Sequence, residues 1–223
     1  MNNDFKKQLI SIIGAKNLLL NDWEKKPFSN GWRYGTRTAL AVVKPGNLIE
    51  LWKVLELCVK NDLIIIMQAA NTGLTGGSTP YGNNYDREVI IINTLRIDKI
   101  HLLNNGNEIL ALAGSTLYDL EKKLLPLGRE PHSVIGSTSI GASIVGSVCN
   151  NSGGSLVKRG PAYTEMSLYA KIDKNGKLLL INDLDIDLGK SPEEILNNLE
   201  NKCFGKKDLL KSKKVSSNET YEK

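Results

Sequence analysis

The stretch IIIMQAANTGLTGGSTP, residues 64–80, decides the fold of this chain. Its apolar, β-branched start predicts a strand buried on both faces, and the strand leads directly into a loop of small residues. The three glycines of the loop let the backbone turn sharply and approach a ligand closely. Successive backbone N–H groups can then converge on an anion, helped by the hydroxyls of Thr72 and Ser78. A plain strand-to-helix connector is the alternative interpretation.

A strand–helix–strand unit surrounds this loop. Residues 39–43 form a short apolar run, after which Asn47 can cap a helix with Glu50 as its reciprocal partner. The strand of residues 63–67 follows within thirty residues, and residues 89–92 form a third apolar run. This order predicts a βαβ unit with a parallel pair of strands.

The flanking regions predict further elements of mixed type. We expect an amphipathic helix over residues 4–20, a polar connector over residues 21–38 and a helix capped by Ser115. The Asn175-Gly176 pair predicts a hairpin, and Ser191 followed by Pro192 predicts a last helix. A βαβ unit followed by hairpin-rich structure is typical of an α+β fold.

A second Gly/Ser-rich segment covers residues 133–154, with glycines at 136, 141 and 146. Such small residues allow a helix to pack closely on another backbone, or to present its N–H groups to a phosphate. Neither this segment nor the first loop contains the GxxxxGK[ST] or GxGxxG motif. Two such segments favour a ligand with two phosphates and a long body, whereas a tightly packed structural helix remains the alternative.

Composition and charge exclude several classes of protein. The 223 residues contain three widely spaced cysteines and no run of ~18 apolar residues, which excludes a disulfide framework, a cysteine zinc site and a membrane span, and suits a reducing cytoplasm. The net charge is +5, but residues 202–223 hold seven lysines against three carboxylates and therefore carry +4 of it. Since the remaining chain is nearly neutral, we expect no nucleic-acid partner.

Three motifs carry a resemblance to a known family. The segments QAANTGLTGGSTP, PLGREPHSVIGS and IGASIVGSVCNNSGGSLVKRGPAYTEMSL resemble the bacterial quinone-dependent, FAD-linked D-lactate dehydrogenases, over about residues 5–200. The flavin domain of that family belongs to the vanillyl-alcohol oxidase/p-cresol methylhydroxylase superfamily. The resemblance implies an α+β, PCMH-type FAD-binding domain, with a small βαβ subdomain and a larger, mainly antiparallel one that is incomplete at the C-terminus. We expect three parts, namely a helix and connector (1–34), the FAD-binding domain (35–206) and a basic, disordered tail (207–223).

The resemblance also implies FAD as the cofactor. Its pyrophosphate is expected at residues of the first loop, Ala69, Ala70, Asn71, Thr72, Gly73, Gly77 and Ser78, and the flavin at Gly136, Ser143 and Gly153. The only histidines, His101 and His132, lie outside the first loop, so a non-covalent FAD is implied. No catalytic and no metal-binding residue is expected in this chain.

The activity implied is oxidation of D-lactate to pyruvate, with electrons passing through FAD to quinone, at the cytoplasmic face of the bacterial inner membrane. The chain is expected to be an N-terminal piece, so that D-lactate and quinone would bind only through missing domains. A downstream polypeptide carrying the cap and membrane-binding segments is an expected partner. The alternatives are a non-catalytic FAD-binding remnant, or a subunit of a split flavoenzyme that acts on another D-2-hydroxy acid.

Overall fold

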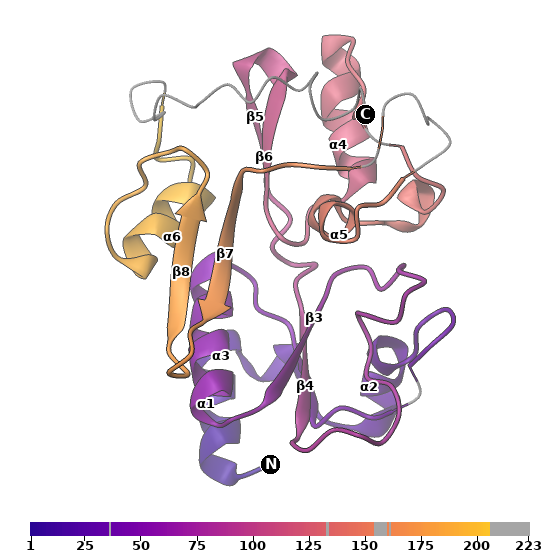
Figure 1. Cartoon of the computed structure of the whole chain (residues 1–223), viewed down its shortest axis with the longest axis vertical. Coiled ribbons are helices and arrows are strands. Elements are labelled where there is room, and N and C mark those ends of the chain that lie inside the picture. The colour runs from indigo at the N-terminus through magenta and orange to yellow at the C-terminus, as the bar shows by residue number, and fades with distance from the viewer. Residues whose placement is uncertain (36, 133, 154–159, 161, 206–223) are drawn as a thin grey trace.

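The computed structural model describes residues 1–35, 37–132, 134–153, 160 and 162–205. Its first half is built around a four-stranded sheet in the order β1-β2-β4-β3 (Figure 1). The strands of this sheet are β1 (Leu18–Leu19), β2 (Ala41–Val43), β3 (Ile64–Gln68) and β4 (Val89–Asn93). Strand β1 is antiparallel to β2, whereas β2 and β3 both pair in parallel with β4. The predicted βαβ unit is therefore confirmed, with β4 inserted between its two strands.

Helices cover both faces of this sheet. They are α1 (Asn3–Ile13), α2 (Asp22–Ser29) and α3 (Leu48–Lys60). Apolar side chains of α1 and α3 form one core cluster with Val43 and Ile92, whereas Phe28 of α2 packs with Val42 and Ile91. Because consecutive residues of a strand point to opposite faces, α1 and α3 cover one face and α2 the other. The predicted cap of α3 is confirmed, since Asn47 Oδ1 accepts from Glu50 N at 2.7 Å.

Three expectations about this half were wrong. The helix expected over residues 4–20 ends at Ile13, because Gly14 adopts a φ of 76° and the chain then turns into β1. The expected connector of residues 21–38 contains α2. Strand β3 is not buried on both faces, since it lies at the edge of the sheet, where its isoleucines are half-buried and Met67 is 44% exposed.

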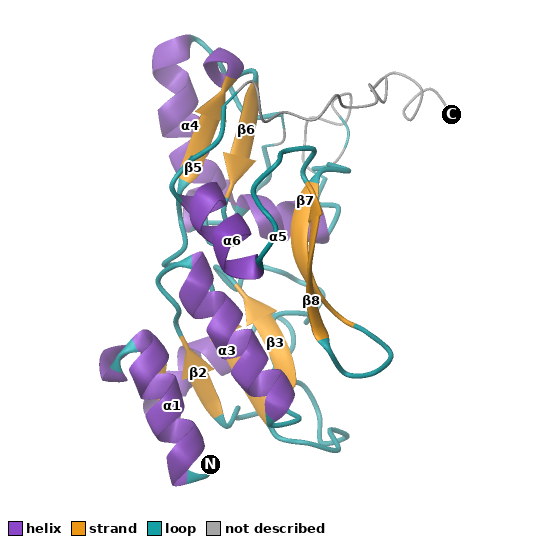
Figure 2. Ribbon diagram, turned by 90° about the vertical axis from the view of Figure 1, so that its left-hand side faces the viewer, coloured by secondary structure: helices purple, strands orange, loops and turns teal. Residues whose placement is uncertain are grey.

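The second half carries two separate antiparallel pairs of strands and three helices among the described residues (Figure 2). The first pair, with the helices that follow it, comprises β5 (Ile100–Leu103), β6 (Glu108–Ala111), α4 (Leu117–Leu124) and α5 (Ile144–Cys149). The second pair and the last helix are β7 (Ser167–Ile172), β8 (Leu178–Asp183) and α6 (Pro192–Glu200). Short 3₁₀ turns occupy Ala15–Asn17, Asn104–Gly106, Leu125–Leu127 and Thr138–Ile140.

Local signals in this half are mostly confirmed. The Asn-Gly turn joins β7 to β8 with Gly176 at a φ of 76°, and the Ser191 hydroxyl caps α6. The expected cap of α4 is off by one residue, because Thr116 accepts from Asp119 N at 3.1 Å. The Ser115 hydroxyl instead donates to Leu112 O at 2.6 Å. The mixture of a parallel sheet, antiparallel pairs and helices is the expected α+β class.

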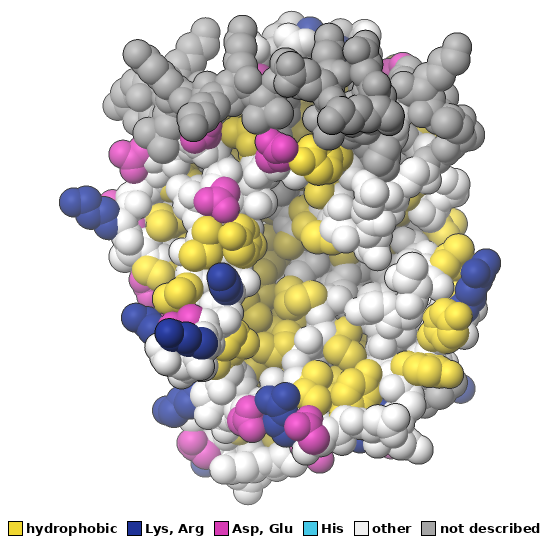
Figure 3. Space-filling model, viewed as in Figure 1, with side chains coloured by type: hydrophobic (Ala, Val, Ile, Leu, Met, Phe, Trp, Pro, Cys, Tyr) yellow, Lys and Arg dark blue, Asp and Glu magenta, His cyan; other side chains and the backbone are white. Residues whose placement is uncertain are grey.

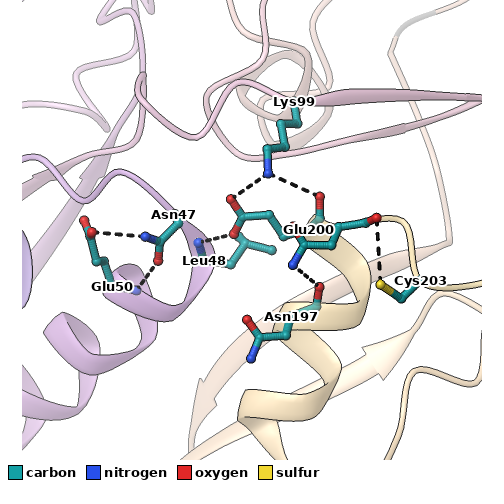
Figure 4. A network of polar contacts seen from close by, with 8 residues as sticks. Asn47, Leu48, Glu50, Lys99, Asn197, Glu200 and Cys203 are labelled. Carbon is teal, nitrogen blue, oxygen red and sulfur yellow. Dashed lines mark hydrogen bonds and ion pairs between the residues drawn. The ribbon is translucent and has the colours of Figure 1, made fainter.

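Helix α6 connects the two halves. A core cluster joins Trp52 of α3 to Leu110 of β6 and to Leu196 of α6. The carboxylate of Glu200 at the end of α6 is part of the polar network drawn in Figure 4. Its Oε2 accepts from Leu48 N at 2.7 Å, and its Oε1 lies 3.3 Å from Lys99 Nζ. One carboxylate thus ties the last helix to the start of α3 and to the residue that precedes β5.

Two expectations lie beyond these observations. The tail of residues 207–223 is outside the described residues, and the domain limits at residues 34 and 206 stay predictions. No helix in the described part of the chain is long and apolar enough to cross a membrane.

Candidate functional site

The site begins where β3 ends, at Gln68, and continues through the loop of residues 69–79. This loop lies at the carboxyl end of the parallel strands, the edge at which ligands bind in open sheets of this kind. Figure 3 shows hydrophobic side chains gathered in a hollow on this face of the molecule, over the position of β3. In β3 itself, the isoleucines are half-buried and Met67 is exposed.

Side chains of the loop hold it against the segment that follows α2. Asn71 Nδ2 donates to Asn30 O at 2.8 Å, and the Ser78 hydroxyl donates to Asn71 Oδ1 at 2.9 Å. The Thr79 hydroxyl donates to Tyr34 O at 3.3 Å. Asn71 also takes the left-handed conformation, with a φ of 54°. The hydroxyl proton of Ser78 is therefore used within the chain, so an anion at this position would meet backbone N–H groups instead.

The backbone N–H groups of the loop are free. Within the described part of the chain, no N–H of residues 69–78 donates a hydrogen bond to another group. Residues 69–72, 76 and 78 of this run are half-buried, whereas the others are exposed to solvent. Buried N–H groups are ordinarily paired, and successive unpaired ones in an irregular loop can form an anion site. The loop also contains no charged residue, so its attraction for an anion comes from these peptide dipoles.

Two glycines of the loop have no explanation inside the chain. Gly73 and Gly77 do not have a positive φ. Among the described residues, a Cβ added at Gly73 would meet no atom within 4 Å, while one at Gly77 would only touch Thr75 Oγ1 at 4.0 Å. Gly76 is different, because its φ is 79° and its added Cβ would contact the Tyr34 side chain. A bound pyrophosphate can approach the backbone closely only where no side chain is in the way, and these two glycines, with ordinary backbone angles, leave such open space. The residues present therefore fit such a group.

The second Gly/Ser-rich segment surrounds the start of α5. Ser143 is buried and caps this short helix, since its Oγ accepts from Gly146 N at 3.1 Å. Gly136 and Gly153 resemble Gly73, because they lack a positive φ and an added Cβ would have no neighbour within 4 Å among the described residues. No hydrogen bond between described residues joins Gly136, Ser143 or Gly153 to the first loop.

Thr94, directly after β4, links the two regions indirectly. Its hydroxyl lies 3.3 Å from Gln68 O and 3.1 Å from Ala113 O, within hydrogen-bonding distance of both. From there Ser115 O accepts from Ile144 N at 2.9 Å, at the first residue of α5. The end of β3 and the start of α5 are thus connected through a short, buried path, which the sequence did not indicate.

The described residues of the two segments, 69–79 and 134–153, include no charged side chain. No group of three His, Cys, Asp or Glu side chains in the described part of the chain could hold a metal. His101 lies in β5, where its Nε2 is buried without a hydrogen-bond partner and its ring meets Phe204 edge-on at 6.5 Å. His132 is exposed in the connection between α4 and α5. The arrangement can bind and orient an anionic ligand, and none of its described side chains is placed for proton transfer.

Comparisons with known proteins identify the family of this chain. The model of the FAD binding domain family matches residues 39–181. The quinone-dependent D-lactate dehydrogenase of Escherichia coli K12 is 60% identical over 199 residues, which is 89% of this chain and 35% of the relative. The enzyme of the same name from Haemophilus influenzae is 55% identical over 202 residues, covering 91% and 36%. The chain thus spans about a third of the length of these curated relatives.

The fold has a counterpart among solved structures. p-Cresol methylhydroxylase with substrate bound superposes with a TM-score of 0.60 at 15% sequence identity, over 80% of this chain and 35% of that one. At this identity the likeness concerns the fold alone, and it confirms the expected PCMH-type architecture.

Proposed function

The chain belongs to the family of FAD-binding domains, and on that premise we propose that it is the flavin-binding part of a D-lactate dehydrogenase that transfers electrons to quinone. Two enzymes of that name, at 60% and 55% identity, support the choice of substrate and acceptor. Because the chain spans about a third of their length, the D-lactate and quinone sites are assigned to a further polypeptide that carries the remaining domains. Because quinone is lipid-soluble, we propose that the enzyme lies peripherally at the cytoplasmic face of the membrane, where it can deliver electrons to quinone.

The free N–H groups of residues 69–78 are the observation that carries the proposal. We assign the pyrophosphate of a non-covalently held FAD to this loop. The residues proposed to surround it are Ala69, Ala70, Asn71, Thr72, Gly73, Gly77 and Ser78. Asn71 and Ser78 contribute by bracing the loop through their side chains, and Gly73 and Gly77 by leaving room for the phosphates.

The second region is assigned to the flavin end of the cofactor. Gly136 and Gly153 leave open surface, and Ser143 keeps the start of α5 in place by capping it. When bound, FAD supplies the acceptor for the two electrons and the hydrogen removed from C2 of D-lactate. The residues of this chain bind and orient the FAD. Uncharged backbone N–H groups bind its phosphates, and the apolar hollow over β3 excludes water.

Flavin binding by Gly73→Asp tests the assignment of the first loop. A carboxylate about 4 Å from a phosphate at a protein surface repels it by up to ~4 kcal/mol, so FAD affinity should fall by roughly a hundredfold or more. The charge-matched control is Asn175→Asp in the β7–β8 turn, where Asp-Gly is as acceptable as Asn-Gly. Quenching of flavin fluorescence gives the affinity. Equal FAD affinity of the two variants would refute the assignment.

Turnover tests the activity. The purified chain with FAD, D-lactate and an artificial electron acceptor should bleach the acceptor only after a separately expressed polypeptide with the remaining domains is added, because geometric positioning of the substrate supplies much of the rate. Turnover by the chain alone would contradict the assignment of the substrate site elsewhere. Flavin binding without turnover in either mixture would favour a non-catalytic FAD-binding module, and turnover with another D-2-hydroxy acid alone would correct the substrate.

A further inference from the structure

Gln68 is a buried amide at the end of an otherwise apolar strand. It is the last residue of β3, and its side chain and backbone together are 3% exposed. A primary amide carries two N–H donors and an oxygen that accepts two hydrogen bonds. Burying such a group is unfavourable unless these positions are paired. Its partners therefore tell what the side chain does.

Both donors of Gln68 are used, and on different segments. Nε2 donates to Phe28 O at 2.8 Å and to Ser78 O at 2.7 Å. Both partners are carbonyl oxygens, so the atom facing them must be the nitrogen of the amide. Oε1 accepts from Asn93 Nδ2 at 3.2 Å. One side chain thus joins the end of α2, Ser78 near the end of the loop and the last residue of β4.

The hydrogen bonds of Gln68 hold the two ends of the loop together. Gln68 precedes residue 69 directly, and Ser78 is the last residue but one of the loop of residues 69–79, so the amide connects the two ends of the segment with unpaired N–H groups. Asn93 adds a second tie at the first end, by donating to Ala69 O at 2.9 Å. Because no backbone hydrogen bond inside the loop determines its shape, side-chain contacts must do so, both at Asn71 within the loop and at its two ends.

We propose that Gln68 is a positioning residue for the phosphate-binding loop, holding its free N–H groups in the geometry that an organic pyrophosphate requires. This inference rests on the proposed function. It assigns to Gln68 no contact with the ligand: the amide acts through Ser78 and Phe28. Its substitution should therefore weaken pyrophosphate binding while the fold, which is stabilised by the core clusters around α1, α3 and α6, persists.

The first test compares Gln68→Met with Gln8→Met, a substitution at the chain's only other glutamine, which lies on α1 and bonds to Asp4. Methionine keeps the length and volume of the side chain and removes both donors. FAD affinity of the full chain, from quenching of flavin fluorescence, should fall about tenfold or more in Gln68→Met, as expected for two lost hydrogen bonds, and should stay unchanged in Gln8→Met. Circular dichroism without FAD reports whether each variant is folded.

A second variant separates positioning from general damage. In Gln68→Glu the ionised side chain has no donor, whereas the protonated one has a single O–H that can reach one of the two carbonyl oxygens. Its FAD affinity should therefore rise several-fold between pH 8 and pH 5.5, relative to the wild-type chain, and Gln68→Met should show no such rise.

The outcomes distinguish this inference from the proposed function. Weak binding by both variants, with recovery of Gln68→Glu at low pH, supports positioning by the amide. Wild-type affinity in Gln68→Met, or a pH profile of Gln68→Glu parallel to that of the wild type, overturns the inference and leaves the proposed function intact. Failure of the wild-type chain to bind FAD overturns both.

Discussion

Replacing Glu200 by Ala should destabilise the chain by about 2–3 kcal/mol. Its carboxylate accepts from Leu48 N, one of the first N–H groups of α3, which have no partner inside the helix. The Glu200 side chain is only 11% exposed, and a hydrogen bond to a charged group in such a place contributes ~1.5–3 kcal/mol. The ion pair with Lys99 adds little, ~0.2–1 kcal/mol, because the Lys99 side chain is 49% exposed. Lys99→Met should therefore cost less than ~1 kcal/mol.

Urea unfolding followed by circular dichroism measures these differences. For a domain of this size the loss in Glu200→Ala corresponds to a drop in Tm of roughly 4–12 °C. Glu200→Gln keeps an acceptor for Leu48 N and should lie between the other two variants. Glu56→Ala, at an exposed position of α3, is the matched control and should stay within ~0.5 kcal/mol of the wild type. The reasoning would be refuted if Glu200→Ala were as mild as Glu56→Ala, or if Lys99→Met were as damaging as Glu200→Ala.

Two titratable side chains yield the remaining predictions. Burial raises the pKa of Cys58 to about 12, so at pH 8 a thiol reagent should modify the exposed Cys149 and Cys203 in the folded chain and Cys58 only after unfolding. Stability should also fall between pH 9 and 12, where only the unfolded chain releases that proton, and a Cys58→Ala variant with an equal fall would contradict this. Burial and the nearby Lys202 lower the pKa of His101, so the folded chain should lose stability as the pH falls below 6.5, where the unfolded chain takes up the proton first. Between pH 7 and pH 5, Tm should fall less in His101→Leu than in the wild-type chain. An equal fall in both would show that His101 is not the cause.

Signals confined to a few neighbouring residues were sufficient for much of the fold. Asn47 and Ser191 cap their helices through the N–H three residues later, and the Asn-Gly pair turns β7 into β8. These contacts depend on backbone geometry within one turn, so the sequence alone determines them. The loop after β3 was recognisable for the same reason, because glycines and small polar residues directly after an apolar strand restrict what the backbone can do there. The role with FAD that we propose for it rests on a resemblance of whole motifs and not on spacing.

Contacts between distant segments could not be predicted in this way. The apolar run of β3 is compatible with a central or an edge strand, and only the insertion of β4 between β2 and β3 leaves it at the edge. The amide of Gln68 reaches Phe28, forty residues earlier, and Glu200 reaches Leu48 across 152 residues. The type of a side chain determines how many hydrogen bonds it can make. Its partners depend on which segments the fold brings together. The sequence therefore determined that an uncharged loop of small residues follows β3, and the tertiary structure decided which groups hold its ends and leave its N–H groups free.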